Sequence, residues 1–270
     1  MDTNKNTYTV IYTIVLVAVV ATILAVVSIG LKPRQQENIK VEKQMNILNC
    51  DNLATDAKTV SDRNSYVQSE FDKYITEALI VNCKGEVTVT FNEKIGDCES
   101  FKIATADQAA KEALAKDIQL PVFICNNPDG TKHYILSGYG AGLWGPIWTY
   151  IAVKEDGKIA GALFDHESET PGLGGEIVTE KFRSQFNDKV VMENGEIVPI
   201  TVVKGGAKNP NEIDALSGAT ITSKAVEKMI ADWMALYKPY LQKISGSKAQ
   251  PATEPADVDN KEDNQTPKTE

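Results

Sequence analysis

The chain has 270 residues, 42% of them hydrophobic, and its 37 acidic and 28 basic side chains give a net charge of −9. A nucleic-acid-binding domain needs a basic face that displaces counterions from phosphate, and an acidic chain without a Lys/Arg run supplies none. The histidines and cysteines are too far apart in the sequence for a zinc finger, a c-type haem site or a self-contained iron–sulfur cluster. We therefore expect no nucleic-acid partner and no metal site.

An uncharged segment extends from Asn6 to Leu31. Residues 10–31 are almost continuously hydrophobic, and as a helix they would span about 33 Å, at about 1.5 Å per residue. This length predicts a transmembrane helix. A cleaved signal peptide is the alternative, because Ser28 and Gly30 form a small-x-small pair, but its apolar core would be only about 7–15 residues long, behind a basic start. We favour an uncleaved anchor preceded by a short flank, residues 1–9.

The charges that flank this span leave its orientation open. One lysine precedes it, and four basic residues follow it, namely Lys32, Arg34, Lys40 and Lys43. Counted literally, the positive-inside rule places the rest of the chain in the cytoplasm, but the rule applies to short loops, and large domains translocate largely regardless of it. The four cysteines permit up to two disulfides in three pairings without requiring any.

Polar segments lie on both sides of the central part of the chain. Residues 32–48 carry a few hydrophobic side chains among charges, which suits an amphipathic stalk or, as we favour, a solvated linker helix. Residues 245–270 contain three prolines, six acidic residues and no aromatic residue, so they cannot bury a core, and we expect a disordered acidic tail. The remainder, about 210 residues, is enough for one sizeable core or two small ones.

The first half of this remainder predicts strands joined by short turns. The runs ALIVN and EVTVTF are separated by residues 83–85 at hairpin spacing. ATADQAAKEALAKDI is rich in Ala, also contains Glu and Lys, and predicts a helix. VFICN and HYILSGYG then flank the turn sequence Asn-Pro-Asp-Gly at residues 127–130.

The second half predicts two tighter hairpins and a long helix. IWTYIAV and KIAGALF flank Asp156-Gly157, and KVVM and EIVPITVV flank Asn194-Gly195, both sequences that accept positive φ angles. EIVTEKFRSQF is helix-like, and hydrophobic residues from position 225 to 237 fall at helical spacing in a helix that we expect to end near residue 240. This order predicts an α+β fold with antiparallel hairpins behind a single N-terminal transmembrane helix.

The usual catalytic fingerprints are absent from the sequence. It contains no Ser-His-Asp order, HExxH, Walker loop or GxGxxG, which argues against the common hydrolases, nucleotide hydrolases and dinucleotide-binding proteins. Three other segments stand out: GAGLWGPIW at residues 140–148, HESETPGLGG at residues 166–175 and DALSGATITS at residues 214–223.

In the third segment, Ser217, Gly218 and Ala219 leave space around Thr220. The long helix should begin within about three residues, with Thr222 or Ser223 as its N-cap, and a helix N-terminus offers free N–H groups and a positive potential to an anion. A phosphate beside Thr220 would therefore be stabilised, with Lys224 as the only nearby positive charge. On physics alone we favour the simpler interpretation, a capped loop-to-helix turn.

The other two segments suit a planar ligand. The glycines of HESETPGLGG allow a loop to lie flat against a ring, although a surface turn with His166 as a hydrogen-bonded structural residue is the simpler alternative. Trp144 and Trp148 stand on either side of Gly145-Pro146 and could stack on an aromatic ring system. Their alternative role, which we favour on physics alone, is as core aromatics.

Taken together, these three segments, behind one N-terminal span followed by GLKPRQQ, resemble the C subunits of the Na⁺-translocating NADH:quinone oxidoreductases. The resemblance covers nearly the whole chain except the acidic tail. It implies an FMN-binding α+β domain at residues 80–244, a stalk and helical entry at residues 32–79, and the transmembrane helix at residues 10–31.

In that family a separate flavin transferase, which uses FAD, joins FMN through its phosphate to the last Thr of the S/T-G-A-T motif, here Thr220. The resemblance therefore implies covalent FMN, no acid–base catalytic residue and no metal. It also implies that eight further residues contact the cofactor: Ser217, Gly218, Ala219, Glu169, Thr170, Leu173, Gly174 and Trp144.

The resemblance also implies a place in the cell. The domain would face the periplasm from the inner membrane and pass single electrons within a multi-subunit complex that oxidises NADH, reduces quinone and exports Na⁺, without being active alone. The G subunit of the Rnf ferredoxin:NAD⁺ complexes shares the attachment motif and is one alternative. The other is a membrane-anchored module that holds a ligand noncovalently, with Thr220 only at a helix start.

Overall fold

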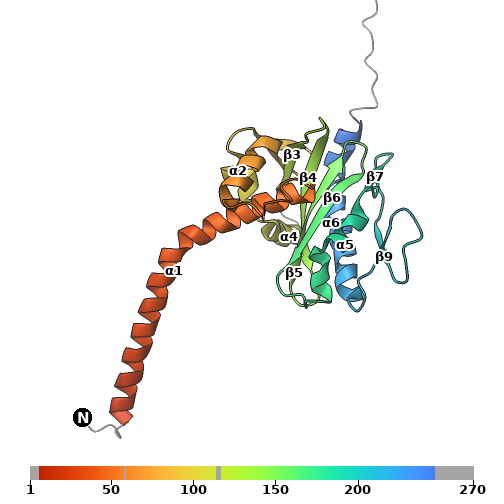
Figure 1. Ribbon diagram of the computed structural model, residues 1–270. Coiled ribbons are helices and arrows are strands. Elements are labelled where there is room, and N and C mark those ends of the chain that lie inside the picture. Colours follow the sequence, from red (N-terminus) through yellow and green to blue (C-terminus); the bar gives the residue numbers. More distant parts are fainter. Residues whose placement is uncertain (1–5, 58, 114–116, 247–270) are drawn as a thin grey trace, which may run out of the picture.

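The computed structural model describes residues 6–57, 59–113 and 117–246 (Figure 1). The predicted acidic tail lies outside these ranges from residue 247 onward, as do residues 1–5 of the N-terminal flank and residues 114–116 of the predicted Ala-rich helix.

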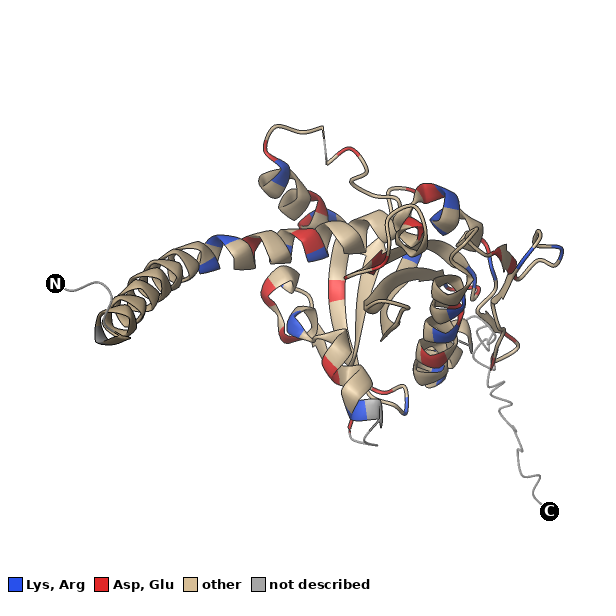
Figure 2. Ribbon diagram, turned by 90° about the horizontal axis from the view of Figure 1, so that it is seen from below, with Lys and Arg blue, Asp and Glu red and all other residues tan. Residues whose placement is uncertain are grey.

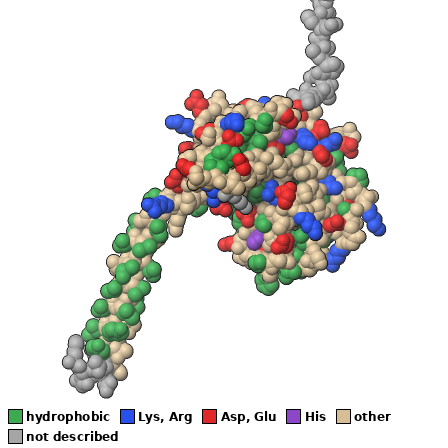
Figure 3. All heavy atoms as spheres, in the orientation of Figure 1, with side chains coloured by type: hydrophobic (Ala, Val, Ile, Leu, Met, Phe, Trp, Pro, Cys, Tyr) green, Lys and Arg blue, Asp and Glu red, His purple; other side chains and the backbone are tan. Residues whose placement is uncertain are grey.

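The described part of the chain begins with one long helix, α1 (Asn6–Cys50), which projects away from the rest of the molecule (Figure 1). Its first part is apolar on all sides and exposed, and it is long and apolar enough to cross a membrane. Hydrophobic side chains cover the projecting part, and charged side chains begin only where α1 approaches the domain (Figures 2 and 3). Pro33 lies inside the helix, where a proline removes one intrahelical hydrogen bond, and the helix is bent between its two parts.

The last turns of α1 belong to the core of the domain, so the predicted solvated linker helix is wrong for this segment. Val41, Ile47, Leu48 and Cys50 are almost completely buried. The reason is that these side chains, spaced at helical intervals, cover one face of the sheet and remove its apolar surface from water. The boundary predicted at residue 80 between the stalk region and the domain stays a prediction.

A six-stranded antiparallel sheet forms the centre of the domain, in the order β2-β1-β3-β4-β5-β6. Its strands are β1 (Ile75–Val81), β2 (Val87–Phe91), β3 (Leu120–Asn126), β4 (Lys132–Ala141), β5 (Pro146–Lys154) and β6 (Ile159–His166). Two small sheets accompany it, formed by β7 (Met192–Glu193) with β8 (Glu196–Ile197) and by β9 (Thr201–Val203) with β10 (Glu212–Asp214).

The helices divide between the two faces of the sheet, and each face carries its own core (Figure 1). Because side chains alternate along a strand, Val122 and Leu136 point to one face and Phe123 and Ile135 to the other. The first face packs against α6 (Thr220–Gly246) and α5 (Glu180–Arg183), and the second against the end of α1, α2 (Arg63–Tyr74) and α3 (Glu99–Lys102). The remaining elements are α4 (Thr105–Ala113) and the 3₁₀ turns η1 (Ile95–Asp97), η2 (Gly174–Val178) and η3 (Ser184–Phe186).

The predicted α+β class and the predicted hairpins are confirmed. Asn194 and Gly195 have φ angles of 51° and 78°, the consecutive positive values of a tight hairpin turn. Three helix predictions are wrong in extent. EIVTEKFRSQF forms three short turns (η2, α5 and η3), and α6 continues past residue 240 to Gly246 with Pro239 inside it. The predicted Ala-rich helix does not include Asp117 and Ile118. All four cysteines are free thiols.

Candidate functional site

The structure places Thr220 at the first residue of α6, directly after a turn in which Gly218 has a φ of 74°. The first intrahelical bond runs from Ser223 N to Ala219 O at 3.0 Å, so the prediction of Thr222 or Ser223 as the N-cap is wrong. The residue before the helix is Ala219, whose side chain accepts no hydrogen bond. The first N–H groups of α6 therefore lack the side-chain cap that Ser, Thr or Asp would give them.

Of the three hydroxyls in TITS, only that of Thr220 is free. Thr222 Oγ1 donates to Glu169 Oε2 at 2.7 Å, and Ser223 Oγ donates to Ala219 O at 2.9 Å while accepting from Leu216 N at 3.0 Å. Both of these side chains are buried, whereas Thr220 is half-buried and, within the described chain, its hydroxyl has no hydrogen-bond partner. A reagent that modifies one hydroxyl here would find only Thr220 available.

Thr220 lines a cavity of about 600 Å³. The loop before the helix and the exposed Leu143 and Ile221 form its walls, and Lys204 contributes a positive charge. The predicted cation, Lys224, does not line this cavity and instead pairs with Glu227 at 2.7 Å. No local pattern in the sequence indicated Lys204, because it directly follows β9, 16 residues before Thr220.

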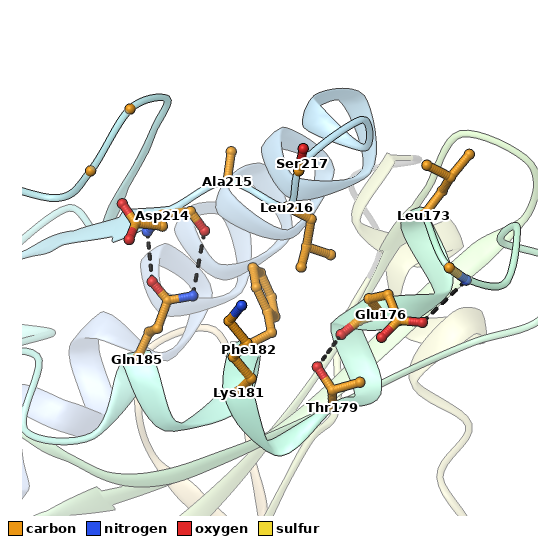
Figure 4. A pocket seen from close by; sticks show the side chains of 13 residues that line it. Leu173, Glu176, Thr179, Lys181, Phe182, Gln185, Asp214, Ala215, Leu216 and Ser217 are labelled. Atoms are coloured by element: carbon orange, nitrogen blue, oxygen red, sulfur yellow. Dashed lines mark hydrogen bonds between the residues drawn. The ribbon is translucent and has the colours of Figure 1, made fainter.

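A second cavity of about 620 Å³ adjoins the first, since both include Gly205, Ala215, Leu216 and Ser217 (Figure 4). Leu173 stands at one side of it, and the buried Phe182 lies beneath Leu216. Gln185 holds the far wall by accepting from Asp214 N at 2.7 Å. Each cavity falls within the usual range for sites that bind a small molecule or a cofactor, roughly 300–1,000 Å³.

Large hydrophobic side chains are exposed around these cavities. Leu143, Leu173 and Ile221 line them and are 45%, 43% and 63% exposed, and Trp144, next to Leu143 in the chain, is 67% exposed. The alternative role of Trp144 as a core aromatic is therefore wrong, while Trp148 is half-buried. Apolar groups exposed together at the mouth of a cavity lose contact with water when a ligand covers them.

The HESETPGLGG loop places Glu169 inside the protein and most of its other residues at the surface. Glu169 Oε1 accepts from Leu143 N at 2.6 Å and from Trp144 N at 3.0 Å, and its other oxygen accepts from Thr222. His166 Nδ1 accepts from Glu169 N at 3.3 Å, so His166 is hydrogen-bonded within the loop, and its structural role stays a prediction. Thr170 is exposed, and Gly174 is buried against Glu169.

The fold thus brings together the three segments singled out in the sequence. GLWG follows β4, HESETPGLGG begins at the last residue of β6 and DALSGATITS leads into α6, and the buried Glu169 bonds to the first and the last of them. The cofactor roles assigned to individual residues stay predictions. Among the described residues, no group of three or more His, Cys, Asp or Glu side chains is arranged to hold a metal ion.

A second polar cluster, which the sequence did not indicate, lies at the other end of β4. His133 Nδ1 is 2.7 Å from Asp51 Oδ1, and Asn127 donates to Asp51 Oδ2 at 2.9 Å. This cluster lines a separate cavity of about 600 Å³. Its members come from the end of α1, the β3–β4 turn and β4, and only the folded sheet brings them together.

Comparison with known proteins defines the class. The model of the FMN-binding domain family matches residues 142–235, a range that contains the GLWG, HESETPGLGG and SGAT segments. This part of the chain thus matches an FMN-binding domain, and a long apolar helix precedes it.

The particular family follows from full-length relatives. The C subunit of the Na⁺-translocating NADH-quinone reductase of Vibrio vulnificus (strain YJ016) is 29% identical over 255 residues, 90% of this chain and 96% of that protein. The corresponding protein of Neisseria meningitidis serogroup B is also 29% identical, over 92% of this chain and 98% of that protein.

Solved structures agree with these relatives. The crystal structure of the C subunit from Parabacteroides distasonis is 35% identical, with a TM-score of 0.66 over 78% of this chain and 96% of that one. The chain therefore belongs to the family of C subunits of the Na⁺-translocating NADH-quinone reductases, and the resemblance found in the sequence is confirmed. The structure of Shewanella oneidensis NqrC, 22% identical with a TM-score of 0.61, shares the fold.

Proposed function

We propose that this chain carries FMN joined through its phosphate to Thr220 Oγ1 and passes single electrons within a membrane complex that oxidises NADH, reduces quinone and exports Na⁺. The observation that carries the proposal is the free Thr220 hydroxyl, on an uncapped helix start beside a cavity ringed by exposed apolar side chains. The family to which the chain belongs supports the same function.

The residues around Thr220 fit the phosphate of FMN. The first N–H groups of α6 have no intrahelical acceptor and point toward an anion placed before the helix, and the helix dipole adds a positive potential. Lys204 supplies a full positive charge from the wall of the cavity. Ser217, Gly218 and Ala219 keep the approach to Thr220 open, because none of them has a bulky side chain.

In the proposed attachment step, FAD is the donor of FMN and a flavin transferase is the catalyst. The Thr220 oxygen bonds to the phosphorus of the FMN half of FAD, the phosphoanhydride bond breaks and AMP leaves, and the hydroxyl proton passes to the transferase or to water. Thr222 and Ser223 do not compete, because their hydroxyls are buried and already hydrogen-bonded.

The side chains around the cavities fit the isoalloxazine ring. Trp144 and Leu173 offer exposed apolar surface for the ring, Gly174 keeps the loop close to α6, and Thr170 offers an exposed hydroxyl at the edge of the loop. Glu169 acts on the ring through the loop it holds, because both of its oxygens are already occupied by protein donors. The bound flavin supplies one-electron transfer, which requires no acid–base residue from this chain.

The long apolar helix anchors the chain to the inner membrane, and we place the domain on the periplasmic side, where it would meet the other subunits of the complex. Protease added to right-side-out spheroplasts should then shorten the protein. Full protection, in the presence of a cleaved periplasmic control protein, would instead show that the positive-inside count was right.

Replacement of Thr220 by Val tests the proposed attachment, since Val has nearly the same volume and no hydroxyl. Co-produced with a flavin transferase, the unmodified protein should give a fluorescent band in a denaturing gel, and Thr220→Val should fold normally and give none. Mass spectrometry should find FMN on the peptide that contains Thr220. Flavin on Thr222 or Ser223 would contradict the assignment, and flavin lost from the unmodified protein on denaturation would indicate a noncovalent binding module.

A further inference from the structure

Glu169 is a buried carboxylate at the point where the three motifs of the site meet. Only 4% of the residue is exposed, and its two oxygens accept three hydrogen bonds, from Leu143 N, Trp144 N and Thr222 Oγ1. These donors belong to the β4–β5 loop and to the first turn of α6. One side chain therefore joins two segments that are separated by about 80 residues in the sequence.

Two glycines make room for this carboxylate. A Cβ atom at Gly142 would overlap Glu169 Oε1, and a Cβ atom at Gly174 would overlap Glu169 Oε2 and lie 2.6 Å from Thr222 Oγ1. The glycines of GLWG and PGLGG thus serve a close approach between backbone and carboxylate. A side chain at either position would push Glu169 away from its donors.

The carboxylate is ionised at neutral pH. Burial by itself raises the pKa of Glu169, but the hydrogen bonds from Trp144, Thr222 and Leu143, together with a smaller effect of His166, outweigh burial and leave the pKa below its usual range. None of the ion pairs formed by the described residues involves Glu169. Its negative charge is held by N–H and O–H dipoles and is not cancelled by a neighbouring Lys or Arg.

The hydrogen bonds of Glu169 fix groups that surround Thr220 without touching Thr220 itself. Leu143 and Trp144 have exposed side chains on a backbone that the carboxylate holds in place. Thr222 is two residues after Thr220, about 200° around the helix, so anchoring Thr222 inward turns Thr220 outward toward the cavity. The conformational entropy of this loop is thus lost during folding and not during ligand binding.

We propose that Glu169 is a positioning residue for the flavin: it locks the GLWG loop to the start of α6, and its charge, which is not paired with a Lys or Arg, holds the reduction potential of the flavin low. The inference rests on the proposed attachment at Thr220. A negative charge fixed beside the cofactor opposes the addition of an electron, and a fixed Trp144 backbone gives the ring one defined environment.

The test uses the full-length chain, co-produced with the other subunits and the flavin transferase. Glu169→Gln removes the charge and keeps the shape, Thr222→Val removes one donor, and Thr222→Ser restores that donor. Glu167→Gln is the matched control, because it changes the net charge equally on an exposed side chain two residues away. The readouts are flavin on Thr220 by mass spectrometry, the visible circular dichroism of the flavin and its reduction potential in a redox titration.

We expect Glu169→Gln to raise the potential and weaken the visible circular dichroism, Thr222→Val to weaken the dichroism, and Thr222→Ser and Glu167→Gln to resemble the unmodified protein. If Glu169→Gln does not fold, the Thr222→Val and Thr222→Ser pair decides: equal dichroism in the two would overturn the inference. So would an unchanged potential in folded, loaded Glu169→Gln, or an equal shift in Glu167→Gln. Absence of flavin from Thr220 in the unmodified protein would refute the proposed attachment instead.

Discussion

Two buried carboxylates lie near opposite ends of β4. Asp51 lines one cavity of about 600 Å³, and Glu169 accepts from the backbone of Leu143, which lines another of about the same volume. Asp51 lies beside His133, in the second residue of β4, and Glu169 lies beside the loop that begins at Gly142, immediately after the strand ends. Nine residues of extended strand separate these points, roughly 30 Å at about 3.3 Å per residue. The two sites are therefore comparable in size and burial but independent in space.

Their surroundings differ in kind. The Asp51 cavity is lined by polar side chains apart from Pro128 and Ala160, and its hydrogen bonds join the end of α1 to the sheet. The site beside Glu169, at the other end of β4, combines exposed hydrophobic side chains, a free hydroxyl and an uncapped helix start. Cavity volume alone would not distinguish the two; the mixture of apolar surface and anion-binding groups does. We interpret the Asp51 cluster as a structural contact between α1 and the sheet, and the site beside Glu169 as the cofactor site.

The largest effect that would test this difference between the two sites comes from filling the space beside Glu169. Gly174→Val should lower the free energy of unfolding by about 3 kcal/mol, because its side chain displaces the carboxylate from its donors, and it should abolish flavin loading. Gly172→Ala is the matched control: nothing lies within 4 Å of its Cβ position, and its φ of 76° should cost only about 1 kcal/mol. Denaturant unfolding and in-gel flavin fluorescence measure both effects. Similar losses in the two variants would show that loop strain, and not the carboxylate, controls the site.

The structural role of the Asp51 cluster is tested by Asp51→Ala, which leaves His133 and Asn127 without their acceptor. We expect a loss of about 2–3 kcal/mol in the free energy of unfolding with no change in the flavin potential. Asp129→Ala, on an exposed turn at the same cavity, should cost less than about 1 kcal/mol. A shifted flavin potential in Asp51→Ala would mean that the two ends of β4 are coupled.

The smallest expected effect comes from Lys204. Lys204→Gln should slow flavin loading by the transferase about threefold, because an exposed charge contributes at most about 1 kcal/mol to the binding of a phosphate. Lys208→Gln, on the same exposed loop but outside the cavity, is the control. The initial rate of covalent flavin incorporation at low salt measures the difference. Equal rates for both variants would show that Lys204 does not contribute to phosphate binding.

Much of the fold was predictable because its signals are local. The hairpin at Asn194-Gly195 depends on two residues that tolerate positive φ, and the apolar segment at residues 10–31 depends only on length and composition. Helix ends were less predictable: Thr222 and Ser223 have the right chemistry for an N-cap, yet their hydroxyls bond elsewhere and the helix begins earlier. The stalk was misassigned because Val41 and Ile47 look sparse among charges until the sheet that covers them is known.

The sequence by itself determined the apolar span, the α+β order of elements and the three motifs that identify the family, since each is written in residues that lie close together in the chain. Only the tertiary structure decided which hydroxyl is free, that Lys204 and not Lys224 lines the cavity beside Thr220, and that Glu169 is enclosed by donors from two other segments. The physical reason is that hydrogen-bond partners and burial depend on distances between segments far apart in sequence, which no local pattern encodes.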